Sequence, residues 1–278
     1  MRVDQTTVDR VVTIVEAAGA AIMEIYDVDF AVEYKDDSSP LTQADLAAHK
    51  IIVAGLEAAF PSIPILSEEA APAPFSERSQ WSQYWLVDPL DGTKEFVNRN
   101  GEFTVNIALI ENNEAVLGVV GVPVQKQTYT GDVTSGIARV LHEGDTIGRD
   151  LLGKPRAAND VSISIVASRN HGGERIESYL DAVGKRFPEL SRNAVGSSLK
   201  LCTLAAGGAD LYPRLGPTSE WDIAAAHAVL RAAGGDVVTP DGETMRYNTK
   251  ESVLNPDFLA VADRRFNWMD ALPQFPVD

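Results

Sequence analysis

WLVDPLDGTKEF, residues 85–96, joins an apolar run to two aspartates and a glycine. The run YWLVD at 84–88 is typical of a strand, and it delivers Asp88 at the strand's C-terminal end. A tight turn then presents Asp91 three residues later, so two carboxylates converge. Mg²⁺ prefers carboxylates, waters and phosphate oxygens, and the turn exposes the Leu90 carbonyl as another oxygen ligand. The stretch therefore predicts a magnesium site.

The glycine and threonine after Asp91 are suited to hold a phosphate. Gly92 permits close approach of the backbone, and the amides of Gly92 and Thr93 open a short helix, TKEFVNRN at 93–100. The dipole of such a helix favours an anion at its start. The alternative is an ordinary Asp-rich turn in which Thr93 caps the helix. The motif alone leaves both interpretations open.

Other acids occupy positions that fit the same site. Glu68 follows the strand-like IPIL at 63–66 and so lies at a strand end, while its neighbour Glu69 can equally face solvent. Asp222 opens a helix after GPTSEW, where a first-turn acid also complements the helix dipole. Asp45 ends the stretch TQAD before an apolar run. That capping-box pattern makes helix capping the favoured interpretation of Asp45 from the residues alone.

Apolar spacing predicts the order of helices and strands. Spacings of three and four indicate helices over 8–26 and 42–60. The second helix would have one face made of Leu46, His49, Val53, Leu56 and Phe60. Strands are predicted at 63–66, 84–88, 103–110, 115–122, 162–168 and 209–214, and further helices at 172–183, 197–207 and 222–233. The strands on either side of ENNE predict a hairpin.

A polar stretch near 150–160 predicts a connection between two lobes. The first lobe, 1–155, would be α+β and would carry most of the acids above. The second lobe, 156–278, alternates helices and strands as α/β units do and carries Asp222.

Composition narrows the class of protein. Over 278 residues the formal net charge is −16, which argues against long nucleic acids because these are held by clusters of Lys and Arg. A single cysteine, Cys202, excludes an intramolecular disulfide and a multi-cysteine metal site. The start of the chain lacks a signal-peptide pattern, and no apolar run approaches the roughly 20 residues that span a bilayer. We therefore expect a cytoplasmic protein without integral membrane association.

Four motifs in a fixed order resemble the inositol monophosphatase superfamily of lithium-sensitive, magnesium-dependent phosphatases. They are Thr42–Asp45, Ser67–Glu69, Asp88–Thr93 and Trp221–Ala225, the last followed by Ala233–Gly235. The resemblance covers nearly the whole chain. It implies the sugar-phosphatase fold, in which an α+β lobe and an α/β lobe form a layered αβαβα sandwich with the site between them.

Within that superfamily the chain resembles the bacterial 3′(2′),5′-bisphosphate nucleotidases. The resemblance rests on Lys94-Glu95-Phe96 after the DPLDGT motif, on VGSSLK at 195–200 and on LYPRLGPT at 211–218. Inositol phosphatases usually continue DGTTNF instead. The resemblance implies hydrolysis of the 3′-phosphate of adenosine 3′,5′-bisphosphate to AMP, within sulfate assimilation, with the corresponding phosphosulfate as a second candidate substrate.

The resemblance also implies two or three Mg²⁺ ions and a role for each acid. One ion would be held by Glu68, Asp88 and the Leu90 carbonyl, and a second by Asp88, Asp91 and Asp222. The attacking water would be oriented by Glu68 and by Thr93, with Asp45 behind it. In this interpretation the acidic site recruits the metals, and the metals recruit the anionic substrate.

Nucleotide recognition is assigned by the same resemblance. The implied substrate-binding residues are Gly92, Thr93, Lys94, Ser168, His171, Ser197, Ser198, Lys200 and Arg214. Cations and hydroxyl donors suit a phosphorylated nucleoside. The alternatives are a surface ion pair for Arg214 and an ordinary loop histidine for His171. His227, among alanines in the last predicted helix, is interpreted as structural.

Two other functions remain open at this point. The first is an inositol or sugar monophosphatase with the same metal site, and the second is a regulatory binding protein that retains the fold. The partner would be a small nucleotide, and the protein a monomer or a homodimer. The stretch GDVTSGIARV at 131–140 lacks an aromatic residue common in the superfamily, which leaves the local strand packing open.

Overall fold

The computed structural model describes residues 1–27, 40–167 and 173–276. Its helices are α1 (Gln5–Tyr26), α2 (Pro40–Ala59), α3 (Phe75–Arg78), α4 (Thr93–Val97), α5 (Glu174–Arg186), α6 (Leu199–Ala205), α7 (Glu220–Ala232) and α8 (Trp268–Ala271), with a 3₁₀ turn η1 (Pro123–Gln125). Its strands are β1 (Ile65–Ser67), β2 (Gln83–Asp91), β3 (Thr104–Glu111), β4 (Glu114–Val122), β5 (Gln127–Asp132), β6 (Ile137–His142), β7 (Arg149–Asp150), β8 (Ser162–Ala167), β9 (Glu189–Ala194), β10 (Leu211–Arg214), β11 (Asp236–Val238) and β12 (Phe258–Val261). Every helix and strand predicted from the sequence is present, with its ends shifted by a few residues.

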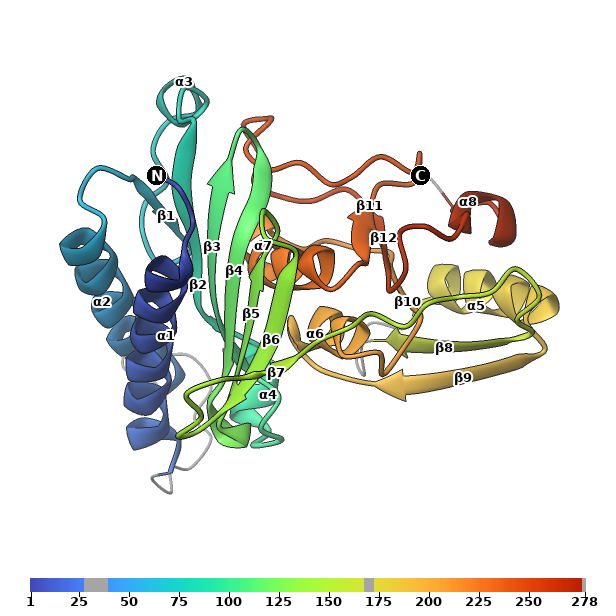
Figure 1. Ribbon diagram of the computed structural model, residues 1–278, viewed down its shortest axis with the longest axis horizontal. Helices are drawn as coiled ribbons and strands as arrows, with labels where there is room; N and C mark the ends of the chain where they lie inside the picture. The colour runs from blue at the N-terminus through green and yellow to red at the C-terminus, as the bar shows by residue number, and fades with distance from the viewer. Residues whose placement is uncertain (28–39, 168–172, 277–278) are drawn as a thin grey trace.

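Helical layers and sheets alternate through the molecule (Figure 1). In the described residues the first sheet has seven strands in the order β1-β2-β3-β4-β5-β6-β7, and the second has five in the order β11-β12-β10-β8-β9. Helices α1 and α2 cover the outer face of the first sheet, α6 and α7 lie between the sheets, and α5 and α8 cover the second. The predicted α+β, αβαβα sandwich is confirmed.

Strand β2 is buried on both faces, which explains its unbroken apolar run. Trp85 and Val87 belong to the core beneath α1 and α2, whereas Tyr84 and Leu86 belong to the core between the two sheets. Side chains alternate along a strand, so a strand covered on both sides is apolar at successive positions. The C-terminal end of β2 is therefore held between two helical layers.

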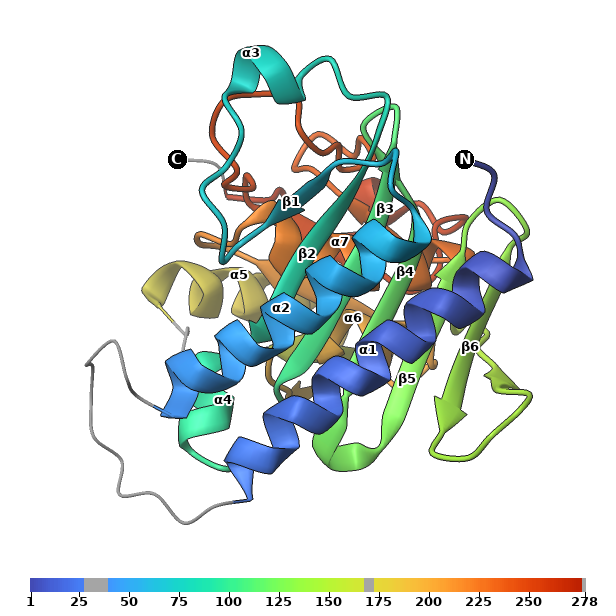
Figure 2. The same cartoon turned by 90° about the vertical axis from the view of Figure 1, so that its left-hand side faces the viewer.

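The buried face of α2 agrees with the predicted one at Leu56 and Phe60 but differs from it at Leu46. Helices α1 and α2 lie side by side across the first sheet (Figure 2), and α2 buries Ala44, Ala48, Ile52 and Leu56 against it. Leu46 is 38% exposed, because a stripe of residues four apart that includes small alanines lets α2 pack closely. In the described part of the chain no helix, these two included, is long and apolar enough to cross a membrane.

Helix α7 comes from the second half of the chain but packs on the first sheet. Gly118 of β4 and Gly131 of β5 are paired across these strands beneath it. A Cβ at Gly118 would lie 1.9 Å from the Ala225 carbonyl oxygen, and one at Gly131 would lie 2.3 Å from the Val229 Cα. Neither position has room for a side chain, so the backbone of α7 sits directly on the sheet.

The two halves of the chain share a core. Leu86 of β2, Val166 of β8 and Leu230 of α7 belong to one buried cluster. The sheets themselves divide along the chain, since β7 ends at Asp150 and β8 begins at Ser162. The division into lobes at residue 155 stays a prediction.

Gly118→Ala is expected to lower the free energy of unfolding by about 2–3 kcal/mol, because the added methyl group pushes α7 away from the sheet. Denaturant unfolding followed by circular dichroism measures this change. Gly184→Ala is the matched control, because the nearest atom to its new methyl group is Leu190 Cδ1 at 3.8 Å and alanine favours the helix. Unchanged stability of Gly118→Ala would contradict the close contact.

Candidate active site

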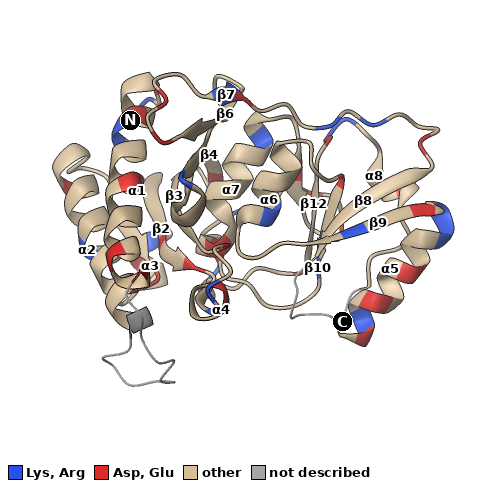
Figure 3. Ribbon diagram, turned by 90° about the horizontal axis from the view of Figure 1, so that it is seen from below, with Lys and Arg blue, Asp and Glu red and all other residues tan. Residues whose placement is uncertain are grey.

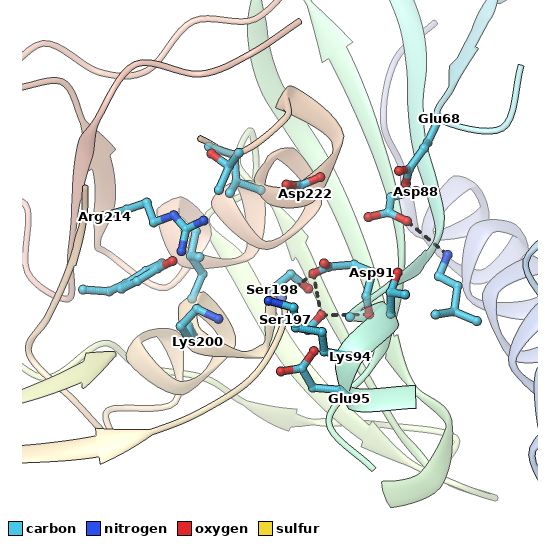
Figure 4. A pocket seen from close by; sticks show the side chains of 17 residues that line it. Glu68, Asp88, Asp91, Lys94, Glu95, Ser197, Ser198, Lys200, Arg214 and Asp222 are labelled. Atoms are coloured by element: carbon cyan, nitrogen blue, oxygen red, sulfur yellow. Dashed lines mark hydrogen bonds between the residues drawn. The ribbon is translucent and has the colours of Figure 1, made fainter. Parts of the chain in front are cut away.

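Parallel pairing of β1 and β2 brings the first two acids together. Ser67 is the register partner of Val87, and the Glu68 amide donates to the Val87 carbonyl at 3.1 Å. Because parallel strands end at the same edge of a sheet, Glu68 and Asp88 emerge side by side. Figure 4 shows their carboxyl groups close together on one side of a pocket.

A bulge in β2 places Asp88 and Asp91 on the same face. Asp88 pairs with Asn106 and Asp91 pairs with Thr104, so three steps along β2 match two steps along β3. Residues three apart on a regular strand face opposite sides, and one extra residue reverses that relation. The sequence predicted a turn after Asp88, whereas the strand continues through Pro89 to Asp91. Proline suits the bulge because it has no N–H to pair.

The glycine after Asp91 ends the strand and starts α4. Gly92 has a φ of +98° and is the N-cap of α4, a left-handed conformation that glycine adopts without strain. Thr93 is the first helical residue, and no side chain caps the helix. The alternative in which Thr93 is the N-cap is therefore wrong. Figure 3 shows acidic segments where β2 meets α4, beside a basic segment of α4.

A pocket of about 280 Å³ collects most of the predicted site residues. From the first half it is lined by Glu68, Asp88, Leu90, Asp91, Gly92, Thr93 and Lys94, and from the second by Ser197, Ser198, Lys200, Arg214 and Asp222. Glu95 and Tyr212 also line it, although the sequence analysis gave neither a role. The predicted contacts Ser168 and His171 lie outside the described residues.

Asp45 does not line this pocket but lies behind it. Helix α2 begins at Pro40, two residues before Thr42, so TQAD is inside the helix and the capping interpretation is wrong. The Asp45 side chain is hydrogen-bonded to Glu69, and its charge interacts with Glu68. Its Oδ1 is buried without a hydrogen-bond partner. Asp45 therefore adds a carboxyl group to the acidic cluster.

Asp222 both caps α7 and faces the pocket. Its Oδ2 accepts a hydrogen bond from the Ser219 amide at 2.9 Å, which completes a capping box at the start of α7. This bond leaves Oδ1 as the oxygen for other partners. Figure 4 shows the Asp222 carboxyl group across the pocket from Asp88. Asp222 is therefore a first-turn acid of α7 that also lines the pocket, and its role as a metal ligand stays a prediction.

A buried network fixes the start of α7. The Arg78 side chain is 2% exposed, and its guanidinium donates to the Asn248 Oδ1. The side-chain Nδ2 of Asn248 donates to the Arg78 carbonyl at 2.6 Å. The backbone N–H of Asn248 donates to Glu220 Oε2 at 2.9 Å. Glu220 is two residues from Asp222. Arg78, the last residue of α3, therefore anchors through Asn248 the end of α7 that carries Asp222.

Crowding of buried acids raises their pKa values. Burial, followed by repulsion from Asp91 and Glu68, raises the pKa of Asp88 well above its usual range. Burial and Asp91 raise the pKa of Asp222 to about 7, and burial and Glu69 raise that of Asp45 to about 8. Burial also raises the pKa of Asp91, against the opposing effects of the Ser197 hydrogen bond and the Lys200 charge.

The donor set fits a divalent cation. Carboxylate oxygens are the ligands that Mg²⁺ prefers, and a cation would relieve the repulsion that raises these pKa values. The oxygens are not already arranged as a cage: in residues 1–27, 40–167 and 173–276 no three Asp, Glu, His or Cys side chains form a ready metal-binding group. Asp91 and Asp222 each direct one oxygen to a protein donor.

Two of the basic residues that line the pocket, Lys200 and Arg214, come from the second half of the chain. The Lys200 Nζ donates to the Val195 carbonyl at 3.3 Å and lies 5.4 Å from the Tyr212 ring centroid. Burial lowers the pKa of Lys200 to about 8. Arg214 forms no ion pair among the described residues and donates from Nη2 to the Pro217 carbonyl at 2.8 Å. The surface ion pair considered for Arg214 is therefore wrong.

The two serines hold Asp91 instead of lying free in the pocket. The Ser197 hydroxyl and the Ser198 amide both donate to Asp91 Oδ2, the second at 2.6 Å. Thr104 and Asn106 of β3 hydrogen-bond to the same serines. The sequence analysis missed these two residues, although polar residues two apart in an apolar strand mark one face of that strand.

His227 is structural, as the sequence predicted. It is fully buried in α7, with Nε2 2.7 Å from Asp236 Oδ1 and Nδ1 2.7 Å from the Tyr247 hydroxyl.

The stretch 131–140, which lacks an aromatic residue common in the superfamily, joins β5 to β6. These two strands form a regular antiparallel pair.

Comparison with known proteins places the chain in a family. A model of the inositol monophosphatase family matches residues 4–268. The chain belongs to the inositol monophosphatase family. Family members that resemble it include the 3′(2′),5′-bisphosphate nucleotidase CysQ of Salmonella typhimurium, 46% identical over 90% of this chain and 97% of that protein. The protein of the same name from Escherichia coli K12 is 44% identical over the same shares.

Solved structures of the family agree with the fold. CysQ from Bacteroides thetaiotaomicron superposes with a TM-score of 0.82 at 39% identity, covering 94% of this chain and 98% of that one. An inositol monophosphatase from Zymomonas mobilis superposes with a TM-score of 0.77 at 20% identity, covering 98% and 99%. The second likeness concerns the fold alone.

Without metal, this family member is expected to lose stability as the pH rises from about 5 to 8. Asp45 and Asp222 titrate near 8 and 7 in the folded chain but near 4 when unfolded. The folded state therefore binds more protons in this window, and each such group lowers the free energy of unfolding by about 1.4 kcal/mol per pH unit.

Chemical denaturation in EDTA at several pH values measures this slope. Asp45→Asn should flatten it, whereas Asp9→Asn, on the exposed face of α1, should leave it unchanged. A wild-type stability that is constant or rises across the window would contradict the acidic cluster.

Proposed function

We infer that the protein is a 3′(2′),5′-bisphosphate nucleotidase, which hydrolyses the 3′-phosphate of adenosine 3′,5′-bisphosphate to give AMP and phosphate. The identity of 46% to a nucleotidase of that name, over 90% of this chain, carries the proposal. The pocket supports it, because Glu68 after β1 and acids of β2 and α7 face Lys200 and Arg214 across one cavity. A nucleoside bisphosphate has two phosphates, one to be cleaved and one to be held.

Mg²⁺ is the proposed cofactor, with two or three ions in the site. Glu68, Asp88, Asp91, Asp222 and the Leu90 carbonyl would hold them. Bound divalent cations would lower the pKa of the attacking water and neutralise charge developing on the phosphoryl oxygens. A dianionic phosphate would otherwise be repelled by the acids that line this pocket.

The side chains around the acidic end orient the attacking water. In this proposal Glu68 accepts a hydrogen bond from that water, and the Thr93 hydroxyl fixes its position. Asp45, hydrogen-bonded to Glu69 behind the pocket, takes up the proton that the water releases. Bound cations would lower its raised pKa, so that the Asp45 carboxylate is free to accept that proton.

The side chains from the second half bind the rest of the nucleotide. Lys200 and Arg214 would hold the phosphate that is not cleaved, and the Tyr212 ring lies beside them in the pocket. Lys94 and the Gly92 and Thr93 amides would hold the reacting phosphate. The predicted lobe 1–155 would thus carry most of the metal ligands, and the predicted lobe 156–278 would carry Asp222 and most of the nucleotide contacts. We propose that the protein acts in the cytoplasm, as a monomer or a homodimer.

Phosphate release from adenosine 3′,5′-bisphosphate tests the proposed substrate. We expect Mg²⁺-dependent release that stops when EDTA is added in excess. Inositol 1-phosphate should react with a kcat/KM at least about tenfold lower, because it has no second phosphate for Lys200 and Arg214 to hold. Equal or preferential use of the inositol compound would favour the monophosphatase alternative.

Asp91→Asn separates the enzyme from a regulatory binding protein with the same fold. The Asn side-chain oxygen still accepts from Ser197 and Ser198, but the charge needed to hold a cation is gone. Activity should fall at least about a hundredfold with an unchanged circular dichroism spectrum. Asp9→Asn is the control and should retain full activity. Undiminished hydrolysis by Asp91→Asn would show that Asp91 is not a ligand.

A further inference from the structure

Two buried polar residues of β3 lie opposite the aspartates at the end of β2. Thr104 is the register partner of Asp91, and Asn106 is the partner of Asp88. Their exposed fractions are 0% and 1%, so water does not satisfy them. A buried hydroxyl or amide lowers stability unless it is hydrogen-bonded. The hydrogen-bond partners of these two side chains therefore indicate their role.

Both side chains bind the serine pair that precedes α6. Thr104 Oγ1 lies 2.6 Å from Ser197 Oγ and 2.8 Å from Ser198 Oγ. Ser198 Oγ donates to Asn106 Oδ1 at 2.7 Å, and Asn106 Nδ2 donates to Thr104 Oγ1 at 3.2 Å. Thr104, Asn106 and Ser198 thus form a compact polar cluster, and Ser197 is attached to it through Thr104.

The number of protons fixes the direction of this chain. A hydroxyl has one proton to donate, and Ser197 donates its proton to Asp91 Oδ2. Ser197 therefore accepts from Thr104, which in turn accepts from the Asn106 amide. Donors run one way from Asn106 to the Asp91 carboxylate, and each hydrogen bond polarises the next. The chain holds the Asp91 carboxyl group in one orientation.

The turn that carries the serines depends on these contacts. Ser197 has a φ of +52°, a left-handed conformation that is unfavourable for a residue other than glycine and persists only where its surroundings impose it. Ser197 is hydrogen-bonded to Asp91 and Thr104, which both belong to the first half of the chain. The neighbouring Gly196 amide donates to Glu102 Oε2, also in the first half, at 2.7 Å. The first half therefore shapes this turn.

We propose that Thr104 and Asn106 are positioning residues for Asp91 and act through Ser197 and Ser198. With Oδ2 held by these donors, Oδ1 of Asp91 is presented to a cation in one orientation. This inference rests on the proposed function, in which Asp91 is a ligand of a divalent cation. It assigns the serine pair a task that is complete before any nucleotide binds.

The test compares Thr104→Val, which keeps the shape but removes the hydroxyl, with Thr104→Ser, which keeps the hydroxyl. Isothermal titration calorimetry with Mg²⁺ alone should show at least about tenfold weaker binding for Thr104→Val, the loss expected when a residue that orients a ligand is removed. Thr104→Ser should bind within about twofold of wild type.

Steady-state kinetics adds a readout that a merely structural role would not move. In Thr104→Val the Mg²⁺ concentration for half-maximal activity should rise by the factor seen in calorimetry. The KM for the nucleotide at saturating Mg²⁺ should stay unchanged, because Lys200 and Arg214 are not altered. A parallel rise in both constants would overturn the inference.

The other outcomes are separable. A folded Thr104→Val that binds Mg²⁺ like wild type, or a Thr104→Ser that binds as weakly as Thr104→Val, overturns the positioning role and leaves the proposed function intact. Wild-type protein that binds no Mg²⁺ overturns the proposed function itself. If Thr104→Val does not fold, Asn106→Ala decides, because it removes the donor to Thr104 and the acceptor of Ser198. If Asn106→Ala binds Mg²⁺ at least about threefold more weakly than wild type, the inference is supported. If Asn106→Ala binds Mg²⁺ as tightly as wild type, the inference is overturned.

Discussion

Repulsion among crowded carboxyl groups is the constraint on which this structure depends. Asp88 and Asp91 lie at the end of one strand, with Glu68 and Asp222 around the same pocket, and burial raises the pKa of each. Such groups stay together only if the surrounding scaffold resists their separation. The fully buried strand β2, covered by helices on both faces, supplies that resistance on one side of the pocket.

Helix α7 supplies the opposite side. Its backbone rests on Gly118 and Gly131, where no side chain intervenes, and its first turn is anchored through Asn248 to Arg78. Asp222 therefore has little freedom to move away from β2. The same capping box that starts α7 also occupies one oxygen of Asp222, so helix formation and orientation of the carboxyl group are a single event.

The two halves of the chain are interdependent at the pocket. Asp91 belongs to the first half, but the donors that orient it come from Ser197 and Ser198 in the second. Lys200 follows in the next turn of the chain, beside Tyr212. Lys200, which is proposed to bind the nucleotide, thus follows in the sequence shortly after the serines that hold Asp91, a proposed metal ligand. The acidic and basic sides of the pocket are built as one unit.

The sequence by itself determined the elements and the order of the acids. Mainly apolar runs identified β2 and β3, and the strand end identified Asp88, because these features depend on residues close together in the chain. Only the tertiary structure decided that Asp88 and Asp91 share a face, since that requires a bulge set by pairing with β3. It also decided that Glu68 lies beside Asp88, that α2 buries Ala44 and Ala48, and that Ser197 reaches Asp91. Each of these contacts joins segments that are far apart in the sequence and come together only when the sheets form. Local conformational propensity does not depend on such distant contacts, so it cannot predict them.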